Sequence, residues 1–239
     1  MNKFFSYFFI SFLAIGSVGL VSCGDDDDSN ASDNNSNSSS LTGSPTSMQE
    51  ISGSKWVANW NQSKAYTSVN GGAKVQTSFQ TNEANDIFLS EIEFFSDGTM
   101  NCVVDTVVSK GQYSINGTDF ATTYDILVTK TEYGFNNTVT QYRKNITIKE
   151  GVDIAEFLGG ELSASGYGFE GFEMPMNYIV TDYDITKSGD KLYITLILTM
   201  KYSDSFIEGF SEGFEGQGMF DNMLNSKTEM YYYMVYDKK

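Results

Sequence analysis

KLYITLILTMK, residues 191–201, is the stretch that decides the fold class of this 239-residue chain. Its apolar side chains occupy alternate positions, and most of the residues between them are polar or aromatic. The apolar set is Leu192, Ile194, Leu196, Leu198 and Met200, and the alternating set includes Tyr193, Thr195, Thr199 and Lys201. Successive side chains of a β-strand point to opposite faces, so a period of two predicts a strand with one buried face.

Similar patterns recur along the chain, whereas the spacing typical of helices is scarce. We expect further strands at 56–60, 87–95, 99–108, 111–115, 120–131, 142–148, 179–185 and 230–236. The segments between many of them are rich in Gly, Asn and Asp, as at Ser96-Asp97-Gly98, Asn116-Gly117-Thr118, 134–137 and 187–190. These residues tolerate the positive φ angles of tight hairpin turns. The sequence therefore predicts an all-β, antiparallel up-and-down barrel, because closing such a sheet into a barrel leaves no exposed edge strand. A β-sandwich is the alternative.

The N-terminus has the features of a secretory signal. Lys3 precedes an unbroken apolar or small stretch over 4–20, which is at the lower limit of the length needed to span a bilayer. Leu20-Val21-Ser22-Cys23 resembles the lipobox of bacterial lipoproteins. That resemblance implies a signal peptide at 1–22, cleavage before Cys23, and a lipid on the Cys23 sulfur that anchors the chain to a membrane. The alternative is an uncleaved membrane anchor.

An acidic run follows the cysteine at Asp25, Asp26, Asp27 and Asp28. This run resembles the surface-export signal of lipoproteins in Bacteroidota-type Gram-negative bacteria, which implies an outer-membrane protein facing the cell exterior. It also fits a solvated, self-repelling tether. Residues 29–47 are mostly Ser, Asn, Asp, Thr and Gly, a composition that predicts a disordered spacer. We therefore expect three parts: the signal at 1–22, the lipidated tether at 23–48, and one domain at 49–239.

Composition excludes several kinds of chemistry. The chain has no histidine, which excludes Ser-His-Asp and Cys-His catalysis and histidine-ligated zinc. It has two cysteines, and if lipid occupies Cys23, then Cys102 has no partner for an intramolecular disulfide and is expected to be a small buried residue. The net charge of −16 disfavours nucleic acid and anionic headgroups as partners.

Three short segments resemble the lipocalin-like lipoproteins of the same bacterial group. They are 51–56 (ISGSKW), 92–99 (IEFFSDGT) and 111–115 (GQYSI). In that family a Gly and a Trp begin the barrel, a Phe-x-x-Asp-Gly-Thr hairpin follows, and a Gly-x-Tyr strand comes next. The resemblance implies an up-and-down barrel able to enclose a small apolar ligand, with Trp56 expected in its core.

Five phenylalanines are the candidate binding residues. Phe169, Phe172, Phe206, Phe210 and Phe214 lie in two glycine-rich segments outside the expected strands, where they would form a lid, a partner-docking surface or a satellite core cluster. Asp182 and Asp184 share one strand face, but their spacing matches no calcium loop and singles out no catalytic pair. We therefore expect a non-catalytic module that binds a small apolar ligand or an envelope protein, with no cofactor and no metal. A structural or adhesion component and, less favoured, a carboxylate-based hydrolase are the alternatives.

Overall fold

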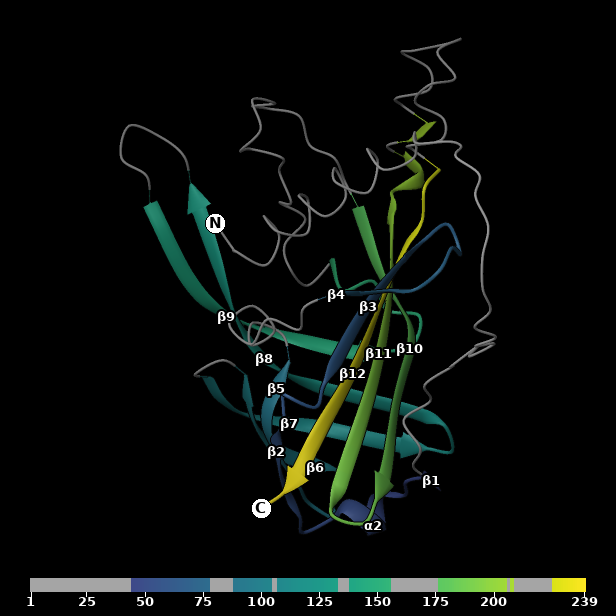
Figure 1. The fold of residues 1–239 in the computed structure, drawn as a ribbon. Coiled ribbons are helices and arrows are strands. Elements are labelled where there is room, and N and C mark those ends of the chain that lie inside the picture. The colour runs from purple at the N-terminus through teal and green to yellow at the C-terminus, as the bar shows by residue number, and fades with distance from the viewer. Residues whose placement is uncertain are drawn as a thin grey trace, which may run out of the picture.

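A computed structural model describes residues 44–77, 88–104, 107–132, 138–155, 176–205, 207–208 and 225–239. Its described part is dominated by antiparallel strands, as the alternation predicts, with the short helix α2 (Met48–Ile51) near its beginning (Figure 1). The strands are β1 (Ser44–Pro45), β2 (Lys55–Ala58), β3 (Lys64–Val69), β4 (Val75–Thr77), β5 (Leu89–Phe94), β6 (Thr99–Val104), β7 (Val107–Asn116), β8 (Asp119–Glu132), β9 (Thr138–Lys149), β10 (Met176–Ser188), β11 (Lys191–Tyr202) and β12 (Thr228–Lys238).

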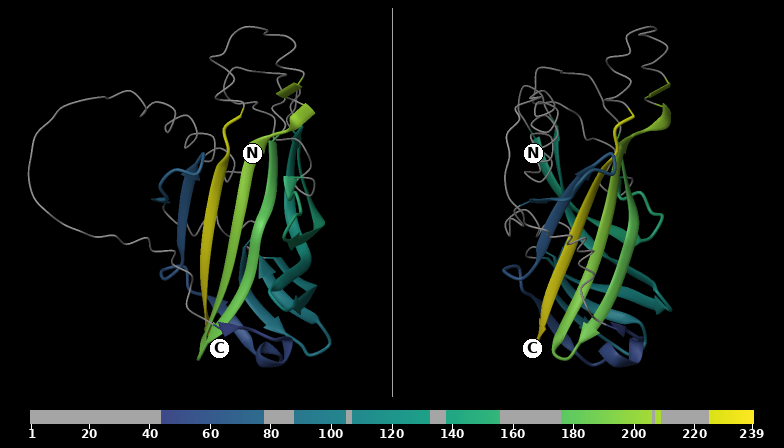
Figure 2. Two further views of the ribbon diagram at one scale, coloured as in Figure 1. Left: turned by 90° about the vertical axis from the view of Figure 1, so that its right-hand side faces the viewer. Right: turned by 45° about the vertical axis from the view of Figure 1, so that its right-hand side comes forward.

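All these strands belong to one sheet, in the order β1-β10-β11-β12-β2-β5-β6-β7-β8-β9. The sheet branches at β12, whose C-terminal end pairs with β2 while its N-terminal half pairs with β3. The branch continues from β3 to β4. Figures 1 and 2 show the long strands β10, β11 and β12 crossing in front of β6, β7 and β8, so the sheet curls back over its own inner face.

The sheet does not close into a barrel, and the prediction of closure is wrong. Where the curled ends meet, the segment after β9 contacts β10 through one bridge, between Asp153 and Ile179. Three backbone hydrogen bonds accompany it, from Gly151 N–H to the Val180 carbonyl (2.8 Å), from Val180 N–H to the Val152 carbonyl (2.8 Å) and from Ile154 N–H to the Tyr178 carbonyl (2.9 Å). Farther along β10, side chains fill the seam: the rings of Phe120 and Tyr183 stack 4.6 Å apart, and the Tyr183 hydroxyl lies 3.0 Å from Thr122 Oγ1.

Two aspartates accept from backbone donors at this edge of β10. The backbone N–H of Tyr178 donates to Asp153 Oδ1 (2.8 Å), and that of Ile185 donates to Asp184 Oδ1 (2.7 Å). The Asp153 contact joins the segment after β9 to β10, whereas Asp184 takes an edge donor that a closing strand would otherwise use. Charged side chains at an edge also disfavour pairing with a foreign strand.

The predicted core face of β11 is confirmed. Leu192, Ile194 and Leu196 are buried, and they pack in one hydrophobic cluster with residues from both ends of the sheet. Each such side chain contributes roughly 1.5–3 kcal/mol on burial. Trp56 and Cys102 also lie in this cluster, as the sequence predicts.

Three predicted hairpin turns are confirmed, between β5 and β6, between β7 and β8, and between β10 and β11. The prediction of one strand over 99–108 is wrong, because Val104 pairs with Val107 and the chain reverses between them. Strands β3 and β4 were not predicted. The reversal between them contains Asn70-Gly71, both with positive φ, which is a strong hairpin signal in the sequence. The prediction of a disordered spacer over 29–47 is wrong at its end, because β1 pairs with β10 there.

Candidate functional site

The described interior of the curled sheet is filled by side chains. A cavity of about 10 Å³ lies there, enough for about one water molecule. Its lining residues are Phe88, Leu89, Tyr124, Ile148, Tyr183, Ile194, Leu196, Met234 and Tyr236. Ligand sites for small molecules commonly measure about 300–1,000 Å³, so this cavity is too small to hold a ligand of that size.

A much larger hollow lies outside, on the face of β6, β7, β8 and β9. This outer groove has a volume of about 960 Å³. Its lining residues are Ser52, Gly53, Phe95, Ser96, Asp97, Thr99, Met100, Asn101, Lys110, Gly111, Gln112, Thr123 and Asn145. Strand register explains the polar floor: Thr99 lies opposite Gln112, Gln112 opposite Thr123, and Thr123 opposite Thr147. Outward positions of four consecutive strands thus form one polar row.

Two asparagines in the groove are held by carboxylates on neighbouring strands. Asn101 Nδ2 donates to Glu93 Oε2 (3.0 Å), and Asn145 Nδ2 donates to Asp125 Oδ1 (2.9 Å). Both pairs lie directly opposite in their ladders. The amide nitrogens are therefore engaged, and the Oδ1 atoms are left as acceptors.

Gly111 shapes the floor of the groove. A Cβ atom at this position would lie 2.4 Å from the carbonyl oxygen of Thr123 and 2.8 Å from Met100 Cε. Only glycine therefore lets β7 approach β8 and the Met100 side chain this closely. The turn between β5 and β6 borders the groove, and Asp97 Oδ1 fixes it by accepting from the backbone N–H (2.9 Å) and the hydroxyl (2.6 Å) of Thr99. These two hydrogen bonds lower the pKa of the Asp97 carboxyl.

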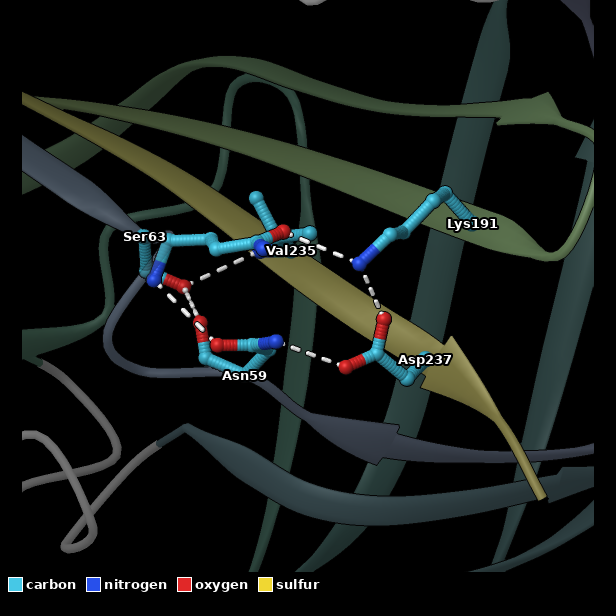
Figure 3. Close-up of polar contacts among 6 residues, drawn as sticks. Asn59, Ser63, Lys191, Val235 and Asp237 are labelled. Atoms are coloured by element: carbon cyan, nitrogen blue, oxygen red, sulfur yellow. Dashed lines mark hydrogen bonds and ion pairs between the residues drawn. The ribbon is translucent and has the colours of Figure 1, made fainter.

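A second polar cluster lies at the corner between β2 and β3 (Figure 3). Val235 of β12 lies at this corner, between the part of β12 that pairs with β3 and the part that pairs with β2. Its carbonyl accepts from Asn59 N–H (2.7 Å), and its N–H donates to Ser63 Oγ (3.0 Å). The Ser63 hydroxyl donates in turn to the Asn59 carbonyl (3.0 Å). A buried serine thus supplies the acceptor that a neighbouring strand would normally provide.

Asp237 completes this corner cluster. Its Oδ2 accepts from Asn59 Nδ2 (2.6 Å), and its Oδ1 pairs with the Lys191 ammonium. Lys191 and then Asn59 lower the pKa of the Asp237 carboxyl. An adjoining hollow of about 480 Å³ includes Trp60 in its lining. Because both carboxylate oxygens are occupied, we interpret the cluster as a structural clasp at the branch of the sheet.

Most of the sequence-predicted site residues lie outside the described residues. These are Cys23, Asp25, Asp26, Asp27, Asp28, Phe169, Phe172, Phe206, Phe210 and Phe214. Asp182 and Asp184 are described, and they lie half-buried near the free edge of β10. Burial, then Asp184 and Glu150, raise the pKa of Asp182.

Sequence reasoning missed the outer groove. Its signal is the run of Thr, Asn and Gln at outward positions of successive strands, which looks like ordinary solvated surface until the register is known. The register brings Thr99, Gln112 and Thr123 side by side although they are 13 and 11 residues apart in sequence.

Within the described ranges, no group of three or more acidic, cysteine or histidine side chains is arranged to hold a metal ion. None of the helices described has the length and apolar character needed to cross a bilayer. Comparison with known proteins finds no matching family model, no matching curated protein and no matching solved structure.

Proposed function

We propose that this chain is a non-catalytic binding protein, anchored to the outer membrane through lipid on Cys23 and exposed to the cell exterior by the acidic run at Asp25–Asp28. Its binding site is the outer groove. The sequence supports the anchor through the lipobox-like Leu20-Val21-Ser22-Cys23, and the Ser- and Asn-rich segment 29–43 that precedes β1 is long enough to hold the domain away from the membrane.

The observation that carries the choice of site is the contrast between the two sides of the sheet. The inner cavity measures about 10 Å³, and the outer groove measures about 960 Å³. The groove also has unused hydrogen-bonding capacity, whereas aliphatic and aromatic side chains fill the described interior. We therefore favour a ligand on the outer face over an apolar ligand enclosed by the sheet.

The test is native mass spectrometry of the protein purified in mild detergent from its own host. We expect the wild-type protein to carry a bound species that the Gln112→Ala/Asn145→Ala variant loses. Recovery of the same species at full occupancy from the variant would refute the groove as the site.

The anchor is tested separately. We expect Cys23→Ala to abolish incorporation of labelled fatty acid, and replacement of Asp25–Asp28 by alanine to keep the lipid but protect the domain from protease added outside intact cells. Fatty acid still incorporated into Cys23→Ala would refute the lipidation site. Unchanged protease accessibility of the alanine variant would refute the export role of the acidic run and leave it only the role of a tether.

A further inference from the structure

We infer that the outer groove binds a neutral, hydroxyl-rich chain, which in chemical terms is an oligosaccharide. This inference rests on the proposed function, because it names the ligand class of the same groove. Three properties of the groove carry it: the arrangement of hydrogen-bond acceptors, the arrangement of donors, and the charge of the lining.

The acceptors are fixed in position. Asn101 and Asn145 use their amide nitrogens on Glu93 and Asp125, so each Oδ1 stays oriented for a donor on a ligand. Within the described residues neither Oδ1 accepts a hydrogen bond. A side chain that is already held loses less conformational entropy when a ligand binds.

Donors lie between these acceptors. Gln112 and Lys110 are exposed on β7, and neither side chain has a hydrogen-bond partner among the described residues. Lys110 lies directly opposite Asn101 in the ladder. Adjacent strands are about 4.8 Å apart, so donors and acceptors follow one another across the groove at that spacing. Hydroxyl groups both donate and accept, and they match such a mixed surface better than a ligand that offers only one role.

The charge of the lining favours a neutral ligand. Asp97 and Lys110 are the charged residues of the groove, one of each sign. The chain as a whole carries a net charge of −16, which disfavours polyanions. Half-buried Phe95 supplies apolar area, on which the carbon-bound hydrogens of a sugar ring can pack. The abundance of amide and hydroxyl groups also distinguishes the groove from the mainly apolar sites that take apolar ligands.

The experiment is native affinity electrophoresis in gels containing soluble starch, dextran, galactomannan or xylan, with polygalacturonate as the acidic comparison. Gln112→Ala/Asn145→Ala tests the groove, and Ser114→Ala/Thr140→Ala is the matched control at two exposed positions outside it. All these substitutions leave the net charge unchanged, so the variants share one reference mobility.

We expect at least one neutral polysaccharide to retard the wild-type protein and the control equally. For the groove variant we expect a dissociation constant at least about tenfold higher. The single variant Gln112→Ala, at an exposed position, provides the same comparison if the double variant fails to fold.

Lack of retardation by every neutral polysaccharide, retardation by polygalacturonate alone, or equal retardation of the groove variant would overturn the inference. The proposed function would survive the first two outcomes if the host-purified protein still lost a bound species upon the groove substitutions. It would fall if the species stayed bound.

Discussion

Replacing Ser63 with alanine should destabilise the domain through a single backbone donor. Ser63 is buried, and its Oγ accepts a hydrogen bond from Val235 N–H (3.0 Å) at the corner where the pairing partner of β12 changes from β3 to β2. Alanine leaves that N–H buried without this acceptor, which costs about 1–3 kcal/mol of unfolding free energy. For a domain of about 190 residues each kcal/mol lowers Tm by about 2–4 °C.

The assay is urea denaturation followed by circular dichroism, with Ser114→Ala as the control at an exposed position on β7. We expect the control to stay within about 0.5 kcal/mol of wild type. Ser63→Thr keeps a hydroxyl and should recover part of the loss. Equal stability of Ser63→Ala and Ser114→Ala would refute the idea that one side chain substitutes for a strand at this corner.

Three further predictions concern the clasp, the seam and the groove. The Asp237 carboxyl has a lowered pKa in the folded protein, so its pairing with Lys191 contributes stability above the unfolded-state pKa of about 3.9 and loses it as pH falls through the folded pKa. The free energy of unfolding, measured with urea from pH 5 down to 2, should fall less for Asp237→Asn than for wild type, by about 0.2–1 kcal/mol, the value of an exposed pair. Tyr183→Phe should keep the ring stack at the seam but lose the hydrogen bond with buried Thr122, at a cost of about 1–3 kcal/mol in the same denaturation assay. An unchanged free energy of unfolding would mean that this hydrogen bond contributes nothing to the seam. Gly111→Ala should push β7 away from β8 and lower the free energy of unfolding by about 1–3 kcal/mol. An unchanged melting temperature would contradict the close approach of the two strands.

Much of the strand content could be predicted from the sequence because burial on one face imposes a period of two. That reasoning works best for β11, where the apolar residues alternate without interruption and all face one core. It fails at 99–108, because only Asp105 and Thr106 separate two strands and no glycine or asparagine marks the reversal. It also passes over β3, whose two buried residues, Ala65 and Ser68, are small and do not lie at alternate positions.

Closure of the sheet and the position of the groove depend on contacts distant in sequence. The contact between the two ends of the sheet depends on Asp153, whose carboxylate accepts from the N–H of Tyr178, 25 positions away. The groove depends on register across four strands and on the close approach at Gly111. Neither leaves a periodic signal in the sequence. The five phenylalanines predicted as binding residues lie outside the described residues, and their role stays a prediction that Phe210→Ser/Phe214→Ser tests by loss of binding without unfolding.

Methyl NMR of the protein labelled at threonine and methionine methyls tests the central claim, that ligand binds outside the sheet, most directly. Thr123 lines the outer groove at an outward position of β8, and buried Met234 lines the inner cavity, so the two methyl signals report on opposite faces. With a polysaccharide that retards the protein, or with an envelope extract of its host, we predict a shift of the Thr123 signal while the Met234 signal stays in place. A shift of Met234 with Thr123 unmoved would contradict the account, because it would place the ligand inside the sheet.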